Sequence, residues 1–335
     1  TAITSRSKMN SKETYVILLR DSDNPERYGI GECALFRGLS AEDTKDYEKL
    51  LAQACSSPLD LPPVSSIRFG FESALADLTN GGIQRFIKSS FTDGEKSITI
   101  NGLVWMGDKR TMKKRIAQKL NQGFKCVKLK IGGISFEDEI ELLRGIRNEF
   151  SSSDIELRLD ANGAFDPQEA LNKLERLAEF DIHSIEQPIK PRQWEKMANI
   201  CELSPIPIAL DEELIGYNGD GVKAEMLDTI KPSYIILKPS LCGGFEEADR
   251  WIALSKERGI GWWATSALES NIGLNAIAQW VSKYEPAIPQ GLGTGALYVD
   301  NFPSPLCLQG DQLSCAKEQI NSLTLWDIAH EPVYG

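Results

Sequence analysis

From about residue 97 the sequence repeats one pattern, in which a short apolar strand is followed by a few loop residues and an amphipathic helix. Helical periodicity is found, for example, at 138–150, 167–180 and 245–259. Eight strands alternating with helices over roughly 200 residues predict the α/β class, as a (β/α)8 barrel of the TIM type. The expected strands span 97–101, 126–131, 156–161, 184–189, 207–212, 234–239, 261–266 and 287–292.

The first ~95 residues do not follow this pattern, which usually marks a separate unit of structure. They offer strands near "TYVILLR" and "RYGIGECA" and helices near "AEDTKDYEKLLAQA" and "IRFGFESALADLT". The tail after Tyr298 is rich in Pro, Ser and Gln and has no barrel strand left to form. We therefore expect an α+β domain over 1–95, joined by the tail 298–335, and a barrel domain over 96–297.

Charge and hydropathy exclude several classes of function. A net charge of −11 and a pI near 4.9 disfavour binding to nucleic acid or to anionic membranes, which reward basic patches. The sequence contains no apolar run long enough to span a bilayer and no signal-peptide core near residue 1. We expect a cytoplasmic enzyme that acts on a small molecule.

The reactive residue types narrow the chemistry further. The 7 cysteines are odd in number and form no C-x-x-C pair, so we expect reduced thiols and neither a disulfide framework nor a zinc cluster. The chain has only 2 histidines, His183 and His330. His183 stands at the start of a strand, where we expect a structural role. Any general base or metal site must therefore be built mostly from Lys, Asp and Glu.

The stretch "CVKLKIGG" places two lysines inside a strand pattern. Because strand side chains alternate between faces, Lys128 and Lys130 share one face, while Val127, Leu129 and Ile131 share the other. Taken alone, such a pair is usually a solvated strand face. The double glycine that follows indicates a strand opening into a loop, where binding residues tend to lie.

Acidic residues stand at the ends of the next three strands. Asp160, Glu186 and Asp211 follow one another at intervals of 26 and 25 residues, and Lys238 comes 27 residues later. In a parallel barrel the active site lies at the C-terminal strand ends, so these side chains should converge. Three converging carboxylates repel one another unless a cation neutralises them, and all-oxygen ligands select a hard ion such as Mg²⁺, with Mn²⁺ as a substitute.

Lysines on both sides of such a metal indicate enolisation chemistry. A second nearby cation disfavours a charged lysine and lowers its pKa, so that it can act as a base near neutrality. The metal then stabilises the oxyanion that forms beside a carboxylate. Two structural alternatives stay open, namely strand-end Asp residues that only cap helices and a ring of salt bridges without function.

Together these residues resemble the muconate-lactonising branch of the enolase superfamily, whose members pair a Lys or His base with Mg²⁺. The matching motifs, one per successive strand, are Lys128-x-Lys130, Asp160-Ala161-Asn162, Glu186-Gln187-Pro188, Asp211-Glu212 and Lys238-Pro239. Within the branch, "GECA" with "GLS", "SALES" and "GLGTG" are similar to the o-succinylbenzoate synthase family. The N-terminal lobe resembles that family's capping domain, with 29–40 as its mobile loop.

The resemblance implies a Mg²⁺-dependent dehydration of 2-succinyl-6-hydroxy-2,4-cyclohexadiene-1-carboxylate to o-succinylbenzoate in menaquinone biosynthesis. It implies Lys130 as the base, Lys238 as the residue that stabilises the enediolate, and Lys128 as the residue that tunes Lys130. It further implies one set of residues that binds Mg²⁺ and a second set that surrounds the substrate. The metal ligands are Asp160, Glu186 and Asp211, and the residues around the substrate are Asn162, Glu212, Ser266, Gly291 and Leu292.

Four other functions stay open. Dipeptide epimerases of the branch carry Asp-x-Asp at the end of the eighth strand, where this chain reads Gly291-Leu292-Gly293. Related synthases often have Asp at the position of Gly293. Because this chain differs from them there, N-acylamino acid racemase and muconate cycloisomerase activities stay open as alternatives. A non-catalytic barrel that binds a carboxylate ligand predicts a missing lysine or metal ligand, and none is missing. The sequence does not decide whether the protein forms a homo-oligomer.

Overall fold

Seven strands form the largest sheet of this computed structural model, which describes residues 2–3, 8–9, 11–105 and 107–330. Each strand lies beside the next one along the chain, and the five neighbouring pairs from β6 to β11 are parallel. The strands are β6 (Gly102–Val104), β7 (Cys126–Lys130), β8 (Glu156–Asp160), β9 (Ile182–Glu186), β10 (Ile208–Leu210), β11 (Tyr234–Leu237) and β12 (Gly261–Ala264).

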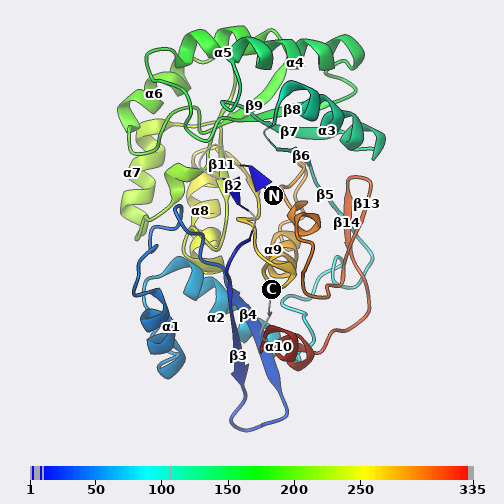
Figure 1. Cartoon of the computed structure of the whole chain (residues 1–335). Coiled ribbons are helices and arrows are strands. Elements are labelled where there is room, and N and C mark those ends of the chain that lie inside the picture. The colour runs from blue at the N-terminus through cyan, green and yellow to red at the C-terminus, as the bar shows by residue number, and fades with distance from the viewer. Residues whose placement is uncertain (1, 4–7, 10, 106, 331–335) are drawn as a thin grey trace. The chain divides into compact units, whose positions relative to one another are not determined.

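A helix follows each of the first six of these strands, which confirms the predicted alternation and the α/β fold class. The helices are α3 (Lys109–Asn121), α4 (Phe136–Glu149), α5 (Ala170–Ala178), α6 (Trp194–Leu203), α7 (Asp220–Ile230) and α8 (Gly244–Glu257). Figure 1 shows α3 to α7, in green shades, along the outside of the strands to which they are connected. Val127, Leu129, Leu157 and Leu159 are almost fully buried on the strand face opposite the lysines.

Two expected barrel strands differ from the prediction. Within 97–101 only β5 (Ile98–Thr99) forms, and it pairs antiparallel with β14 (Gln312–Cys315) instead of joining the barrel sheet. The stretch 287–292 forms isolated bridges at Gln290 and Gly291 and no longer strand: Gly291 pairs parallel with Thr265, and the Gln290 N–H donates to the Thr99 oxygen at 2.9 Å. Pro286 and Pro289 lack the N–H groups that a longer strand ladder requires.

The chain divides into two compact units, and we describe each by itself. The first contains Ile100–Leu237, Trp251–Trp263 and the described residues within Thr1–Ser11, among them the short strands β1 (Ala2–Ile3) and β2 (Lys8–Met9). The second contains Lys12–Thr99, Lys238–Arg250 and the described residues from Ala264 onward. The seven-stranded sheet therefore belongs to the first unit, apart from its last residue.

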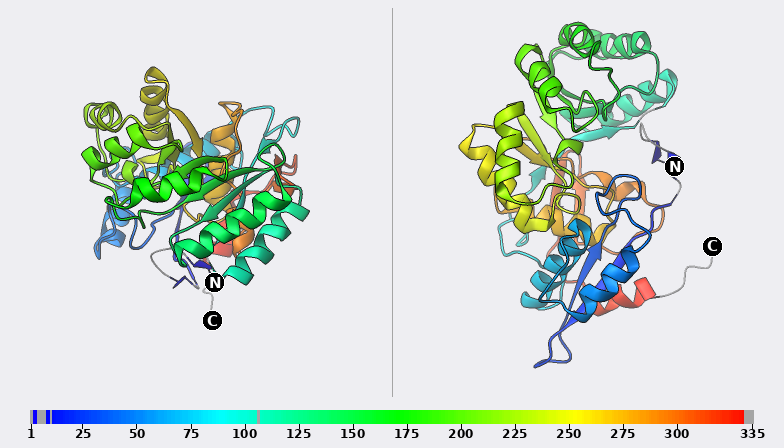
Figure 2. Two further views of the ribbon diagram at one scale, coloured as in Figure 1. Left: turned by 90° about the horizontal axis from the view of Figure 1, so that it is seen from above. Right: turned by 90° about the vertical axis from the view of Figure 1, so that its left-hand side faces the viewer.

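The second unit is built on a hairpin of β3 (Tyr15–Arg20) and β4 (Tyr28–Cys33), with α1 (Tyr47–Ser56) and α2 (Ser65–Thr79) beside it. In Figures 1 and 2, α2 runs along the blue hairpin. The tail returns to this hairpin, because Leu325 packs with Ile30 and Ile272. The remaining elements of the unit are α9 (Asn271–Ser282), η2 (Thr294–Leu297), β13 (Leu306–Gln309) and α10 (Ser322–His330).

Three further sequence predictions can be compared with the fold. All seven cysteines are free thiols. Among the described residues, no helix is both long and apolar enough to cross a membrane. His183 lies at the start of β9, half-buried, with its ring 5.2 Å from that of Tyr234 and its Nδ1 3.0 Å from the Ser184 hydroxyl.

Glycine allows α2 to lie unusually close to β4. A Cβ atom added at Gly31 would stand 1.9 Å from the carbonyl oxygen of Gly70 in α2. We expect Gly31→Ala to lower the free energy of unfolding by ~1–3 kcal/mol or more, because backbone must move apart. Gly145→Ala in α4 is the control, since nothing lies within 4 Å of its added Cβ. Equal denaturant midpoints for wild type and Gly31→Ala would contradict this packing argument.

Burial lowers the pKa of His183 below its ordinary value of 6.5, although Glu156 opposes this effect. The unfolded chain therefore takes up a proton at higher pH than the folded protein does. The contribution of neutral His183 to stability is present above pH 6.5 and is lost as the pH falls through the folded pKa. In urea unfolding between pH 7 and about pH 5, His183→Gln should lose less stability than wild type. If the free energy of unfolding of both proteins changed with pH in the same way, the lowered pKa of folded His183 would be contradicted.

Candidate metal and proton-transfer site

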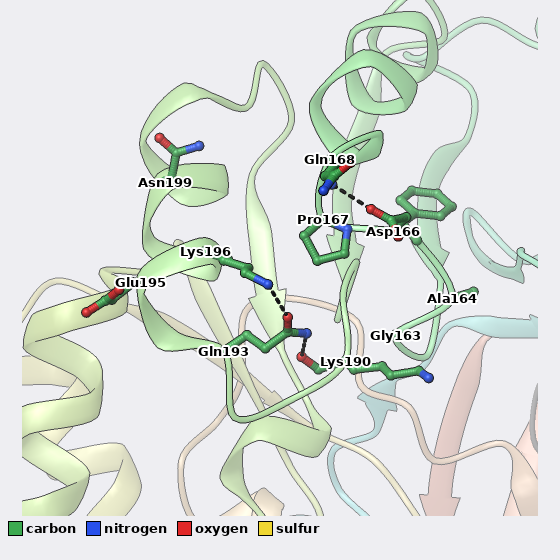
Figure 3. A pocket seen from close by; sticks show the side chains of 11 residues that line it. Gly163, Ala164, Asp166, Pro167, Gln168, Lys190, Gln193, Glu195, Lys196 and Asn199 are labelled. Atoms are coloured by element: carbon green, nitrogen blue, oxygen red, sulfur yellow. Dashed lines mark hydrogen bonds between the residues drawn. The ribbon is translucent and has the colours of Figure 1, made fainter.

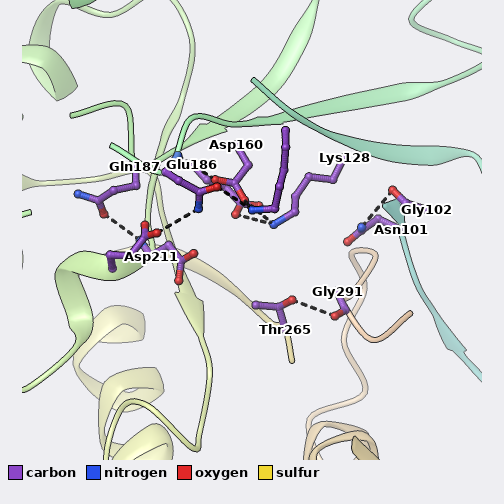
Figure 4. A network of polar contacts seen from close by, with 12 residues as sticks. Asn101, Gly102, Lys128, Asp160, Glu186, Gln187, Asp211, Thr265 and Gly291 are labelled. Atoms are coloured by element: carbon purple, nitrogen blue, oxygen red, sulfur yellow. Dashed lines mark hydrogen bonds and ion pairs between the residues drawn. The ribbon is translucent and has the colours of Figure 1, made fainter. Parts of the chain in front are cut away.

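The register of the parallel strands places three side chains of the first unit at one level, and a fourth follows two residues further along the next strand. Lys130 of β7 pairs with Asp160 of β8, and Asp160 pairs with Glu186 of β9. Glu186 in turn pairs with Ala209 of β10, two residues before Asp211. Because parallel strands end at the same edge of the sheet, their terminal side chains meet there. Figure 4 shows Lys128, Asp160, Glu186 and Asp211 pointing toward one another.

Asp160, Glu186 and Asp211 form a buried carboxylate cluster. One oxygen from each side chain lies within 4.8 Å of the others, and all three side chains are at most 2% exposed. The Glu186 Oε1 atom is buried and accepts no hydrogen bond from any described residue. A buried carboxylate oxygen without a donor, beside two further carboxylates, is the donor set that a hard divalent cation requires. The cluster therefore fits a metal ion.

Electrostatics within the cluster support the same conclusion. Burial raises the pKa of Glu186 above its ordinary value, Lys128 lowers it, and the charges of Asp160 and Asp211 raise it again. A buried acid that resists ionisation in this way gains the most from a cation that neutralises the site. Removal of Glu186 should therefore affect metal binding strongly.

Lys128 is buried beside the carboxylates and neutralises part of their negative charge. Its Nζ donates to Glu186 Oε2 at 2.7 Å and to Asp160 Oδ2 at 3.1 Å. Burial lowers the pKa of Lys128, but the carboxylates of Asp160, Glu186 and Asp211 outweigh burial and raise it above its ordinary value. Lys128 is therefore a fixed cation here, and a bound divalent ion would oppose its charge.

Lys130 lies one strand pleat closer to the strand end. Its Nζ donates to Asp160 Oδ2 at 2.8 Å and to Asn162 Oδ1 at 2.7 Å, and it lies 5.6 Å from the centroid of the Trp105 ring. Two acceptors and an aromatic face hold this amine in one place while it stays close to the carboxylate cluster. Such an amine is positioned to take a proton from a molecule bound at the cluster.

The residues expected around the substrate fall in both units. Asn162 Nδ2 donates to Glu212 Oε1 at 3.0 Å, so these two lie together beside Lys130. Lys238 directly follows β11 and is the first residue of its segment of the second unit.

Three more predicted residues lie together in the second unit. There the Ser266 N–H donates to the Gly291 oxygen at 3.3 Å, and Leu292 follows Gly291 in the chain. The Ser266 hydroxyl donates to Glu269 at 2.6 Å. The structure thus brings Ser266 and the 291–292 stretch together, as an arrangement of that unit.

Sequence reasoning missed three residues next to this site. Trp105 follows β6 and contacts Lys130, but no motif around it indicates that role. Gln187 and Glu213 are fully buried and hydrogen-bonded to each other at 3.3 Å. Both stand directly beside predicted site residues in the motifs Glu186-Gln187 and Glu212-Glu213, which was a signal that could have found them.

A second cleft, of about 780 Å³, opens between the loop after β8 and helix α6 (Figure 3). Its lining is polar and mostly exposed, and it includes Asp166, Gln168, Lys190 and Lys196. The Gln193 side chain crosses its floor, donating to the Lys190 oxygen and accepting from Lys196. Its charged side chains are exposed and of both signs, so we assign this cleft no ligand.

The carboxylate cluster predicts a measurable response to metal. Mg²⁺ should raise the melting temperature of the metal-free protein, and EDTA should reverse the rise, because a ligand of the folded state stabilises it. Glu186→Gln should weaken Mg²⁺ binding at least about tenfold, a loss of about 1.4 kcal/mol. Glu195→Gln on the exposed surface of α6 is the control. The cluster would not be a metal site if Glu186→Gln titrated with Mg²⁺ like wild type.

Comparisons with known proteins are consistent with this geometry. Residues 111–305 match the family described as enolase C-terminal domain-like. The chain is 46% identical over 350 residues, 92% of this chain and 94% of the other, to an o-succinylbenzoate synthase of Desulfotalea psychrophila. The crystal structure of MenC from Desulfotalea psychrophila LSv54 matches 90% of this chain and 94% of its own with a TM-score of 0.78 and 45% identity. A hydrophobic dipeptide epimerase of Enterococcus faecalis is 31% identical over 170 residues, which are 50% of this chain and 46% of the epimerase.

Proposed function

Because the chain belongs to the enolase C-terminal domain-like family and, within it, to the o-succinylbenzoate synthases, we propose that it performs their reaction. The reaction is the dehydration of 2-succinyl-6-hydroxy-2,4-cyclohexadiene-1-carboxylate to o-succinylbenzoate, a step of menaquinone biosynthesis. One observation carries the proposal, namely that two lysines and three buried carboxylates meet on neighbouring strand ends. Free thiols at all seven cysteines favour a reducing compartment, and we propose the cytoplasm.

Asp160, Glu186 and Asp211 would hold the metal, for which we propose Mg²⁺ with Mn²⁺ as a substitute. The bound ion supplies positive charge that stabilises the substrate carboxylate as negative charge builds up on it. Lys128, held between Asp160 and Glu186, keeps a second positive charge beside Lys130.

Lys130 takes the proton from the carbon next to the substrate carboxylate, and the electrons of the broken C–H bond delocalise into that carboxylate. When the electrons return to the ring, the bond from carbon to the hydroxyl group breaks. The same ammonium group of Lys130 gives its proton to the departing oxygen, so that water and the aromatic product leave. Lys238, which follows β11, is proposed to stabilise the charged intermediate. The Asn162 side chain accepts a hydrogen bond from Lys130 through its Oδ1 and donates one to Glu212 through its Nδ2, so it connects these two residues.

An epimerase or racemase would use the same lysines and metal, and the dipeptide epimerase similarity spans half of this chain. Residues 291–293 read Gly-Leu-Gly and offer no carboxylate to a substrate ammonium group. A buried ammonium group needs a negatively charged partner. Because this stretch supplies none, it favours a substrate that has no ammonium group. The dehydration is therefore the function that the chain supports best.

The test measures loss of the ultraviolet absorbance of the cyclohexadiene substrate in the presence of Mg²⁺. Lys130→Ala should slow turnover by at least about 100-fold, because it removes the base. Lys125→Ala, an exposed lysine just before β7, should keep the wild-type rate. Lys130 would not be the base if its alanine variant retained more than about a tenth of the wild-type rate, a barrier change under ~1.4 kcal/mol. An inactive but folded wild type that exchanges deuterium into dipeptides or N-acylamino acids would favour the alternative.

A further inference from the structure

The side-chain amide of Gln187 is fully buried and uses its whole hydrogen-bonding capacity. Its Oε1 accepts from the backbone N–H groups of Asp211 and Glu213, both at 3.2 Å. Its Nε2 donates to the Ile189 oxygen at 3.0 Å and to Glu213 Oε2 at 3.3 Å. The reversed amide would point its NH₂ group at two N–H donors, so only one orientation is compatible with these partners.

This amide joins two strand-end segments that each carry a carboxylate of the cluster. Gln187 directly follows Glu186 at the end of β9, and its Oε1 binds the N–H of Asp211 after β10 (Figure 4). The backbone of Gln187 also bonds to β10, since its N–H donates to the Ala209 oxygen at 2.9 Å. Gln187 has a φ of +37°, an unfavourable backbone conformation for a residue other than glycine, which persists where the surrounding contacts hold it.

Glu213 connects the amide to a second set of contacts. Its Oε1 accepts from the Arg192 N–H at 2.8 Å and from the Trp194 indole at 3.2 Å. The Trp194 indole also donates to the Tyr217 hydroxyl at 3.0 Å. We call Gln187 and Glu213 together the amide clasp. The clasp is thus fixed from both loops, 187–194 and 211–217, and is not a single isolated hydrogen bond.

We propose that Gln187 is a positioning residue for the metal site, whose amide sets the separation of the Glu186 and Asp211 carboxylates. The inference rests on the proposed function only in that these carboxylates hold a divalent cation. Without the amide, the buried N–H groups of Asp211 and Glu213 lose this acceptor, which destabilises the conformation that they now adopt. We therefore expect the 211–213 segment to shift. The Glu186 and Asp211 carboxylates, which lie on separate strand ends, would then fit the ion less well.

The first test is calorimetric titration of the metal-free protein with Mg²⁺ alone. Gln187→Leu, of similar size, should raise the Kd for Mg²⁺ about tenfold or more. Gln193→Ala is the matched control, because this amide lies on the same loop and bonds, among the described residues, to the Lys190 oxygen and to Lys196. Its Kd should equal that of wild type. A folded Gln187→Leu protein whose Kd rises less than threefold would overturn the proposal, even if its melting temperature falls.

A swap of the two clasp residues separates positioning from simple stability. In Gln187→Glu two carboxylates face each other across the clasp, and Mg²⁺ binding should weaken. Adding Glu213→Gln restores one donor and one acceptor, so the double variant should bind Mg²⁺ more tightly than Gln187→Glu alone. If Gln187→Leu does not fold, the comparison of these two variants still tests the proposal. A double variant that binds Mg²⁺ no more tightly than Gln187→Glu alone would overturn it. Because no turnover is measured, failure of the proposed dehydration would be seen separately.

Discussion

Repulsion among three buried carboxylates is the constraint on which the site depends. Asp160, Glu186 and Asp211 stand on neighbouring strands and bring one oxygen each to within 4.8 Å of the others. Two like charges about 4 Å apart cost about 4 kcal/mol even in a partly polar interior. Lys128 offsets part of this repulsion, while Glu186 Oε1 keeps an open lone pair. The arrangement is coherent when a divalent cation completes it.

The parallel ladder explains why such an arrangement can persist. Lys130, Asp160 and Glu186 occupy paired positions on three adjacent strands, so the sheet fixes their spacing without relying on loops. The opposite faces of the same strands carry Val127, Leu129, Leu157 and Leu159, which are almost fully buried. Apolar burial on one face therefore holds the charged groups of the other face in place. Asp211, just after β10, lacks this ladder support, and there the buried amide of Gln187 contacts it.

The sequence was sufficient for the repeated strand and helix pattern and for the carboxylates at the strand ends, because both depend on local spacing. It was insufficient where the structure of a segment depends on a partner far away in the sequence. Ile98 and Thr99 look like a barrel strand, but they pair with residues 312–313. Proline at 286 and 289 limits the predicted eighth strand to isolated bridges at Gln290 and Gly291. Gln187 reads as an ordinary polar residue, since only the fold reveals its four buried hydrogen bonds.

The most direct test of the central claim is an anomalous difference map from crystals of the protein soaked with Mn²⁺. The account predicts one ion bound by oxygens of Asp160, Glu186 and Asp211, with Glu186 Oε1 among its ligands. It also predicts that the peak disappears when Mg²⁺ is in excess, because both ions take oxygen ligands at the same cluster. A map with no ion at the three carboxylates, or with the ion held elsewhere while Lys128 keeps both of its ion pairs, would contradict the account.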